Sequence, residues 1–409
     1  MRTTTTVHAT AAVAAGAMRE ATSPTASWGG VLAMTLCVFA LIASEFMPVS
    51  LLTPIAATLH IAEGLVGDGI AISGALAVVT SLCMSTLASR MNRKTLLLGL
   101  TALMAVSGAT IALAPNYVIY MLGRALIGVV VGGFWSVSAA TAMRLVPPNR
   151  VSRALAIFNG GNALATLVAP PLGSYLGSIV GWRGAFLCLV PVALLAYVWQ
   201  WISLPAMPIG ERTTRSGSVF SHLKNPRVAL GLAAVGVFFM GQFALFTYVR
   251  PFLETITRVD VGTLSLILLA MGVAGFIGTA LIGRFLNRRL SRTLVAIPLL
   301  MSVIALTLIA LGTSVFAVAF LLAIWGLVAT AAPVGWWTWV AQTMPKDAEA
   351  GGGLMVTVVQ LCIALGSTGG GLLFDTSGYR STFVASAILL LVAASLAAAT
   401  SGANQAQTL

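Results

Sequence analysis

The stretch Ser44-Glu45-Phe46-Met47-Pro48-Val49-Ser50-Leu51-Leu52-Thr53-Pro54 places one carboxylate inside a long apolar run that begins near Val31. Roughly 14 residues of this run precede Glu45, which at about 1.5 Å per residue puts the acid near the middle of a bilayer. A charge at that depth costs at least about 2.5–3.5 kcal/mol, so an acid found there by default pairs with another group or carries a proton. We therefore predict a functional role for Glu45. The alternative is a structural hydrogen bond at a helix contact.

The composition indicates a protein that lies mostly in lipid. The chain has 409 residues, of which 58% are hydrophobic and 8% are charged, whereas soluble proteins carry about 25% charged residues. Twelve apolar stretches are long enough to span a bilayer, at residues 31–57, 66–88, 95–114, 117–142, 154–177, 184–204, 228–250, 262–285, 294–312, 316–342, 352–374 and 382–400. We therefore predict an all-α polytopic membrane protein with twelve transmembrane helices.

The basic residues predict the orientation of these helices. With the N-terminus in the cytoplasm, 17 of the 22 lysines and arginines fall on the cytoplasmic side, four fall outside, and Arg124 lies within the membrane. This distribution satisfies the positive-inside rule, so we predict that both termini are cytoplasmic. Because the net charge of +12 follows from this topology, it does not indicate a nucleic-acid partner.

An internal repeat relates the two halves of the chain. Glu45-Phe46 reappears 197 residues later as Gln242-Phe243, and Gly181-Trp182-Arg183 reappears at the same offset as Gly378-Tyr379-Arg380. Two further pairs occur at similar offsets: Lys94-Thr95-Leu96 with Arg292-Thr293-Leu294, and Gly133-Phe134-Trp135-Ser136 with Gly335-Trp336-Trp337-Thr338. Because each copy has an even number of helices, the copies share one orientation. A parallel repeat of this kind places a substrate site between the halves, near the midplane.

The polar segments divide the chain into domains. Residues 205–226 contain prolines, charges and hydroxyls, and we expect them to form a cytoplasmic linker between two six-helix bundles at 28–204 and 227–400. Residues 1–27 are rich in threonine and alanine and lack a signal-peptide pattern, so we expect a disordered cytoplasmic tail. Residues 401–409 form a second, short cytoplasmic tail.

Short motifs add a family resemblance to this architecture. The loop Leu87-Ala88-Ser89-Arg90-Met91-Asn92-Arg93-Lys94 is similar to the G-x-L-a-D-R-x-G-R-K loop of the major facilitator superfamily, with Ser89 and Asn92 at its acidic and glycine positions. Arg124 followed by Gly128 resembles a motif of proton-coupled members, and Ala169-Pro170-Pro171-Leu172-Gly173-Ser174 resembles the exporter motif G-P-x-x-G-G. The chain is thus identified as a member of this superfamily on motifs as well as architecture.

The opening stretch narrows the resemblance to the sugar- and nucleoside-efflux branch of the drug:proton antiporters. Segments such as Gly132-Gly133-Phe134-Trp135 and Gly241-Gln242-Phe243-Ala244 are similar to purine ribonucleoside exporters of that branch. The resemblance implies export of inosine- or guanosine-like nucleosides from the cytoplasm, across a bacterial inner membrane, by alternating access driven by protons. Efflux of sugars or drugs by the same fold is the alternative. Nothing in the sequence indicates an oligomer, so we expect a monomer.

A buried acid and base form the expected proton site. Arg124 is the basic residue that falls inside a predicted span, at a depth within reach of Glu45. We expect the two to pair directly or through water, with Glu45 binding and releasing the coupling proton. No cofactor is expected besides protons. Alternatively, Arg124 is a structural tie between the predicted spans 31–57 and 117–142.

The expected substrate site combines aromatic rings with amides and hydroxyls. Aromatic faces can stack on a purine base, while polar side chains can bind a ribose, and ordinary packing is the alternative for each residue. The candidates are Phe46, Phe134, Trp135, Ser136, Asn159, Asn162, Gln242, Phe246, Tyr248, Trp336, Trp337, Thr338 and Gln360.

Several residues are expected to take part in conformational change. Arg250, near the outer end of the predicted span 228–250, is placed to close an outer gate with Glu254 or to extend toward the membrane surface. The remaining candidates lie in the motifs that carry the family resemblance or in their second-half counterpart, and they are Arg90, Arg93, Pro170, Gly173 and Arg288.

Other functional classes have little support. One carboxylate, Glu45, lies deep inside the predicted spans, while His8, His60 and His222 lie outside them, and the four cysteines form no C-x-x-C pair. This inventory predicts neither a metal site nor an enzyme active site. A channel or a receptor that does not transport is a further alternative, which accumulation of substrate against its gradient would exclude.

Overall fold

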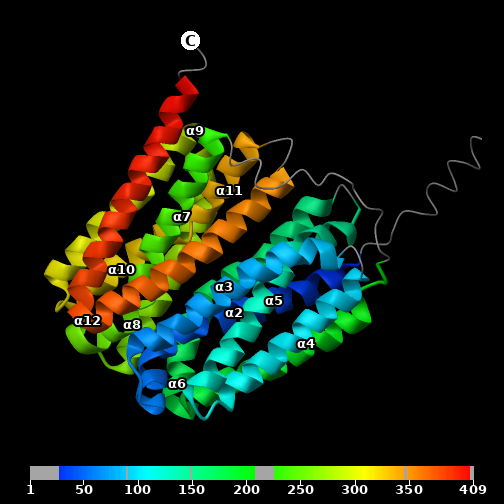
Figure 1. Ribbon diagram of the computed structural model, residues 1–409, viewed down its shortest axis with the longest axis horizontal. Coiled ribbons are helices and arrows are strands. Elements are labelled where there is room, and N and C mark those ends of the chain that lie inside the picture. Colours follow the sequence, from blue (N-terminus) through cyan, green and yellow to red (C-terminus); the bar gives the residue numbers. More distant parts are fainter. Residues whose placement is uncertain (1–26, 89–90, 148–149, 208–224, 345–347, 406–409) are drawn as a thin grey trace, which may run out of the picture.

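The computed structural model describes residues 27–88, 91–147, 150–207, 225–344 and 348–405 (Figure 1). Within these ranges the chain is helical and contains no strand. The expected N-terminal tail, most of the expected linker, the last residues of the C-terminal tail and Arg90 lie outside the described residues. The domain boundaries expected from the sequence therefore remain predictions.

The helices run in two consecutive sets. The first set comprises α2 (Trp28–Leu59), α3 (Glu63–Ala88), α4 (Arg93–Ala112), α5 (Tyr117–Arg144) and α6 (Val151–Ser203). The second set comprises α7 (Pro226–Phe246), α8 (Val249–Phe252), the π-helical turn η3 (Leu253–Thr257), α9 (Val261–Leu311), α10 (Val315–Ala329), α11 (Ala332–Thr343) and α12 (Ala348–Gln405).

The described helices confirm the prediction of twelve membrane crossings. Ten segments are apolar and long enough to span a bilayer, and two of them, with 51 and 48 residues, hold two crossings each. Both long segments bend at a glycine with a left-handed backbone, Gly181 (φ 72°) in α6 and Gly378 (φ 78°) in α12. A side chain is disfavoured at such a φ, so glycine is required at both turns. These two turns occupy equivalent places in the repeat.

Proline explains where the observed helices differ from the predicted ones. The predicted span 316–342 divides into α10 and α11 just before Pro333, and the predicted span 228–250 divides after Phe246, four residues or so before Pro251. Proline donates no backbone hydrogen bond and collides with the carbonyl one turn earlier, so each helix unwinds there. The π-helical turn η3 follows directly and ends at Arg258, which has a left-handed backbone (φ 59°).

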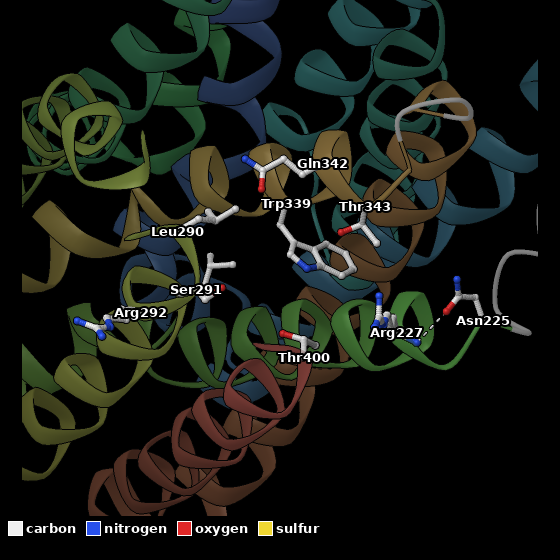
Figure 2. A pocket seen from close by; sticks show the side chains of 10 residues that line it. Asn225, Arg227, Leu290, Ser291, Arg292, Trp339, Gln342, Thr343 and Thr400 are labelled. Carbon is white, nitrogen blue, oxygen red and sulfur yellow. Dashed lines mark hydrogen bonds between the residues drawn. The ribbon is translucent and has the colours of Figure 1, made fainter. Parts of the chain in front are cut away.

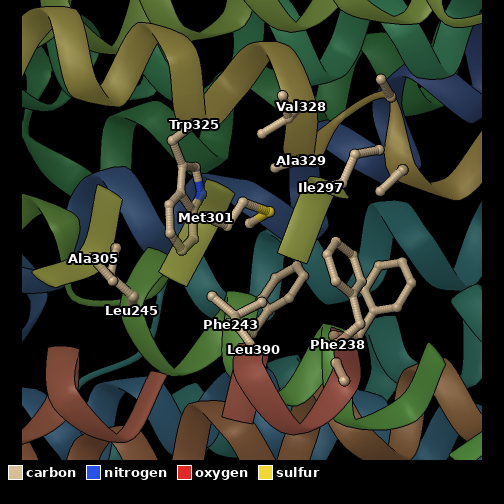
Figure 3. Close-up of a cluster of buried hydrophobic side chains, with 14 of the residues drawn as sticks. Phe238, Phe243, Leu245, Ile297, Met301, Ala305, Trp325, Val328, Ala329 and Leu390 are labelled. Carbon is tan, nitrogen blue, oxygen red and sulfur yellow. The ribbon is translucent and has the colours of Figure 1, made fainter. Parts of the chain in front are cut away.

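Each half buries its own apolar core and presents apolar side chains outward. In the C-terminal half, Phe238 and Phe243 of α7 pack near Met301 of α9 and Trp325 of α10 (Figure 3). On the outer surface, Phe316 is 90% exposed. Such a surface suits lipid as its solvent rather than water. Of the four cysteines, Cys37 is buried, whereas Cys83 and Cys188 are exposed on this surface.

The two halves meet at one end of the molecule. We call the end that carries Trp28 and Gln405 the terminal end and the opposite one the far end. In Figure 1 the ribbons of the two halves come together near α8, at the far end, and diverge toward the terminal end. The hydrogen bonds between described residues of the two halves lie at the far end or at mid-helix.

Candidate functional site

Arg124 of α5 is a fully buried cation at the centre of the N-terminal half. Its Nε donates to the carbonyl of Gly69 at 2.9 Å, and its Nη1 donates to the carbonyl of Ser44 at 3.0 Å. Its Nη2 donates to Ser73 Oγ at 2.8 Å and to the carbonyl of Glu45 at 3.4 Å. The guanidinium therefore ties α5 to α2 and α3. The direct ion pair with the Glu45 side chain, expected from the sequence, is not formed.

Glu45 lies at mid-helix on α2 and faces the opposite half. Its side chain is half-buried, and its Oε1 accepts a hydrogen bond from Gln360 Nε2 of α12 at 3.3 Å. The Gln360 backbone is itself fixed against the other half, because a Cβ at Gly74 of α3 would lie 2.8 Å from the Gln360 carbonyl. Gln360 was expected to contact substrate; the structure places it as the polar partner of the acid.

The repeat counterpart of Glu45, Gln242 on α7, lies next to a second contact between the two halves. Phe46 and Phe243, which follow Glu45 and Gln242 in the sequence, stack with ring centroids 5.9 Å apart. Phe246 packs edge-on against Phe243 at 5.8 Å. The Oε1 of Gln242 is buried and accepts no hydrogen bond within the described structure. This amide oxygen can therefore accept a hydrogen bond from a ligand.

The remaining predicted aromatic residues are not gathered into one site. Phe134 and Trp336, which are equivalent in the repeat, are both fully buried within their own halves. Their neighbours Trp135 and Trp337 are more exposed, and Trp337 is 45% exposed. Tyr248 lies at the far end, where its hydroxyl donates to the Ser367 carbonyl at 2.9 Å. These rings contribute more to packing than the sequence suggested.

The polar side chains predicted to contact substrate mostly form hydrogen bonds within their own helices. Ser136 Oγ donates to the Gly132 carbonyl at 2.6 Å, and Thr338 Oγ1 donates to the Val334 carbonyl at 2.7 Å. Asn159 is exposed and its Nδ2 donates to the Leu155 carbonyl. Asn162 is half-buried on the same helix. Each of these four side chains keeps an acceptor available for a ligand, because a hydroxyl or an amide can donate and accept at once.

Arg250 of α8 joins the two halves at the far end. It forms an ion pair with Glu254 at 2.8 Å, and its Nη1 donates to the carbonyl of Ser50 on α2 and to Ser174 Oγ on α6. The side chain is buried, so these contacts are shielded from water. The structure thus forms the predicted contact with Glu254 and adds two contacts to the other half. Sequence reasoning missed Ser50 and Ser174.

Further acids surround this contact, and we call the set Glu63, Asp68, Glu254 and Asp375 the acidic seam. Asp375 of α12 accepts from the Gly64 backbone N–H at 3.1 and 3.2 Å, and so caps α3 of the other half. Thr368 Oγ1 donates to Asp68 at 2.9 Å, again across the halves. The charges of Glu254, Asp375 and Arg250 all act on Glu63. The seam holds four of the ten acids in the chain.

The other predicted conformational residues fall into two groups. Pro170 and Gly173 lie within α6, and a Cβ at Gly173 would lie 2.6 Å from Ser50 Oγ, so this glycine permits the close contact of α6 with α2. Arg93 begins α4 at the terminal end, and Arg288 lies between the two crossings of α9. No group of three or more potential metal ligands occurs among the described residues.

A family model and several known proteins resemble this chain. The model of the Major Facilitator Superfamily matches residues 34–367. The chain is 66% identical to the Pseudomonas aeruginosa protein named transcription regulatory protein OpdE, over 90% of this chain and 93% of that protein. It is 38% identical to the purine ribonucleoside efflux pump NepI of Salmonella enteritidis, over 91% and 94% of the two chains.

Solved structures share the fold at low sequence identity. A bacterial homologue of the lysosomal transporter Spinster, in an inward-facing and unoccupied conformation, aligns with a TM-score of 0.75 at 17% identity, covering 93% of this chain and 98% of that chain. The nucleoside transporter NupG aligns with a TM-score of 0.75 at 12% identity, covering 92% and 100%. The chain belongs to the Major Facilitator Superfamily, and it is a multi-pass membrane transporter of a small molecule rather than an enzyme.

Proposed function

We propose that this transporter exports purine ribonucleosides of the inosine or guanosine type from the cytoplasm in exchange for protons. The observation that carries the proposal is the hydrogen bond between Glu45 of one half and Gln360 of the other. This bond places a titratable carboxyl at mid-helix, on the surface where the two halves meet. Any change in its charge therefore acts on the contact that must open and close during alternating access.

The coupling follows from the chemistry of this contact. Protonation of Glu45 removes a charge from the membrane interior and weakens the charge-assisted hydrogen bond from Gln360. The two arrangements of the halves then differ in proton affinity, which is the condition for coupling. Glu45 accepts a proton from outside as substrate leaves, and it releases that proton to the cytoplasm as substrate binds. Arg124 holds the backbone at Glu45 in place throughout.

The substrate class rests on similarity and on the mid-helix contacts. NepI, at 38% identity, is named as a purine ribonucleoside efflux pump. Around the repeat-related pair, Phe46 and Phe243 supply aromatic faces, and stacking is worth about 1–3 kcal/mol per base. The buried Oε1 of Gln242 can accept from a ribose hydroxyl or a base N–H. Efflux of sugars or drugs is the alternative, since these contacts suit other neutral polar ligands.

The orientation completes the proposal. We place the chain as a monomer in a bacterial inner membrane with both termini in the cytoplasm, as the positive-inside rule predicts. The far end, where the halves meet, then faces outside, and the conformation is inward-facing. In this state substrate reaches the Glu45 region from the cytoplasm.

The name of OpdE favours a second candidate, a regulatory role without transport. A transporter can itself change gene expression by altering the cytoplasmic level of an effector, so a regulatory phenotype does not exclude transport. Transport by the purified protein distinguishes the two candidates.

The test is uptake of radiolabelled inosine by proteoliposomes with an acidic lumen. For the wild type we expect transient accumulation of inosine above its equilibrium level, because outward proton flow drives inward substrate flow. For Glu45→Gln we expect no accumulation, but continued exchange of labelled for unlabelled inosine. Gln242→Leu, which leaves the acid intact, should weaken inosine binding without abolishing the response to pH.

Three outcomes would contradict parts of the proposal. If the wild type transports no purine nucleoside, direct uptake of labelled sugars and drugs tests the alternative substrates. If Glu45→Gln still accumulates inosine, the proton uses another group. If no small molecule is moved at all, the regulatory candidate is favoured.

A further inference from the structure

A cavity of about 740 Å³ opens at the terminal end of the C-terminal half, well removed from Glu45. It lies among the start of α7, the second crossing of α9, the end of α11 and the end of α12. Figure 2 shows Trp339 in the middle of its lining, with Arg227 and Arg292 on opposite sides.

In the N-terminal half, three of the four equivalent helix ends are packed against one another. There the Ser27 backbone N–H donates to the Leu145 carbonyl and its Oγ donates to the Ser203 carbonyl, both at 2.9 Å. A Cβ at Gly30 would lie 3.2 Å from Leu145 and from Leu204. These contacts close α2, α5 and α6 against one another. The cavity is therefore a property of one half and not of the fold.

The repeat shows which substitutions keep this cavity open. The residue 197 positions after Gly30 is Arg227, so the C-terminal half has a long cation where the N-terminal half has the smallest residue. The residue 197 positions after Ser203 is Thr400, which lines the cavity rather than closing it. A side chain as large as arginine cannot fit the contact that Gly30 makes, so the helix ends stay apart.

The chemistry of the lining indicates an anionic ligand. Among the described residues that line it, two are arginines and none is acidic, while Asn225, Ser291 and Gln342 add neutral hydrogen-bond donors. Guanidinium groups match the geometry of phosphate oxygens. Leu290, Leu294 and Trp339 offer apolar surface beside them.

We propose that this cavity binds a phosphate-bearing anion. Its position at the ends of membrane crossings favours the headgroup of an anionic phospholipid of the adjacent leaflet, and a soluble phosphate ester is the other source of the same chemistry. Basic pockets between helices near the membrane surface bind lipid headgroups in this way. Ligand pockets are commonly about 300–1,000 Å³, so the volume is sufficient. The site does not depend on the transport cycle proposed above.

The test measures the thermal stability of the purified protein in detergent with added ligands. A ligand that binds the folded state raises the midpoint temperature of thermal unfolding. We expect dioleoylphosphatidylglycerol to raise the midpoint of the wild type and dioleoylphosphatidylcholine not to do so. For Arg292→Gln, an exposed position, the shift should fall by at least half. Lys94→Gln is the matched control, because Lys94 is the repeat counterpart of Arg292 beside the closed ends.

The outcomes distinguish a lipid headgroup from a soluble phosphate ester, and they show when the proposal is wrong. One outcome is that glycerol 3-phosphate alone raises the unfolding midpoint, with no effect of phosphatidylglycerol and no shift in Arg292→Gln. That result would identify the ligand as a soluble phosphate ester. Equal shifts in the wild type and Arg292→Gln, or equal shifts with both lipids, would overturn the proposal. Ser291→Phe fills the cavity without changing charge and should also reduce the shift. Native mass spectrometry of bound phosphatidylglycerol checks each result by counting retained lipids.

Discussion

The two halves of this transporter share a scaffold but differ in how their interiors are held together. Both turn through a left-handed glycine at equivalent positions, Gly181 and Gly378. At mid-helix, however, the N-terminal half has Glu45 where the C-terminal half has Gln242. It also has the buried cation Arg124 where the residue 198 positions later, at the offset between the starts of α5 and α10, is Leu322.

This second substitution changes the kind of contact. Arg124 reaches the Gly69 carbonyl through its side chain, whereas Leu322 is a buried apolar residue of the C-terminal core. Both halves bring backbones close together, at Gly128 beside Ser73 and at Gly326 beside Met271, so the difference is that the N-terminal half adds hydrogen bonds from a buried cation. Polar ties respond to charge and close packing does not. The comparison teaches that one copy of a duplicated bundle kept the charge-sensitive interior.

Removing the polar tie should have the largest effect. Arg124→Met keeps much of the side-chain volume but removes the donors to α2 and α3. Hydrogen bonds from a charged group contribute about 1.5–3 kcal/mol each, so we expect the N-terminal half to lose at least about 3 kcal/mol despite the relief of desolvation. Thermal unfolding in detergent measures the loss. Arg380→Met is the control, because it removes the same charge from an exposed position.

An unchanged midpoint for Arg124→Met would mean that packing alone holds both halves. The comparison between them would then lose its physical basis.

Exchanging the acid and the amide between the halves should have the next largest effect. In the double variant Glu45→Gln, Gln242→Glu, the carboxyl remains in the molecule but moves away from Gln360 and Arg124. We expect at least a tenfold loss of proton-driven inosine accumulation in proteoliposomes, about 1.4 kcal/mol of coupling. The single variant Gln242→Glu controls for adding a second acid. Coupling that survives the exchange would show that the position of the carboxyl does not matter.

Hydropathy and the repeat predicted the scaffold well, for physical reasons. Membrane helices need about 20 apolar residues each, so the twelve crossings were visible in the sequence. The turns at Gly181 and Gly378 were marked by the repeated Gly-aromatic-Arg motif. Tyr248 was expected near the substrate because it belongs to the predicted span 228–250. It lies at the far end because α7 ends at Phe246, before Pro251.

The partners of the charged groups were harder to predict. Arg124 binds mostly backbone carbonyls, which every residue possesses, so no sequence signal identifies Ser44 or Gly69 as its acceptors. The acidic seam depends on which helix ends meet across the two halves. The position of each acid near a helix end was a usable signal, but the pairing of Asp375 with α3 required the tertiary structure.

Breaking the contact between the halves at the far end should have a moderate effect. Arg250→Gln removes the cation from the acidic seam and leaves four carboxylates that repel one another. We expect the far end to separate more often than in the wild type, because the remaining carboxylates repel one another. Spin labels at Thr58 and Ser377, both exposed, should report longer distances.

The matched control is Arg183→Gln, because Arg183 is also at the far end but binds the Ala114 carbonyl within its own half. Longer distances in both variants would indicate general destabilisation. Unchanged distances in Arg250→Gln would mean that the backbone contacts of the seam suffice to hold it closed.

The smallest expected effect concerns Asp260, which begins α9 and is the repeat counterpart of Glu63 in the seam. Hydrogen bonds from the side chain and backbone of Thr263 lower the pKa of this exposed carboxyl below its ordinary value. A lowered pKa stabilises the folded state above the unfolded value of about 3.9, and the contribution disappears as pH falls through the folded value. Asp260→Asn should therefore lower the unfolding midpoint slightly at pH 7 and by less at about pH 3.

Thr263→Val, which removes the hydroxyl donor at 2.6 Å and keeps the acid, should show the same trend with a smaller amplitude. Because Asp260 is exposed to solvent, its effect should also weaken in high salt. An Asp260 effect as large as that of Arg250→Gln, or one that grows at low pH, would contradict this assignment. It would also mean that the C-terminal half has a charge-sensitive contact of its own, which would remove the asymmetry between the two halves.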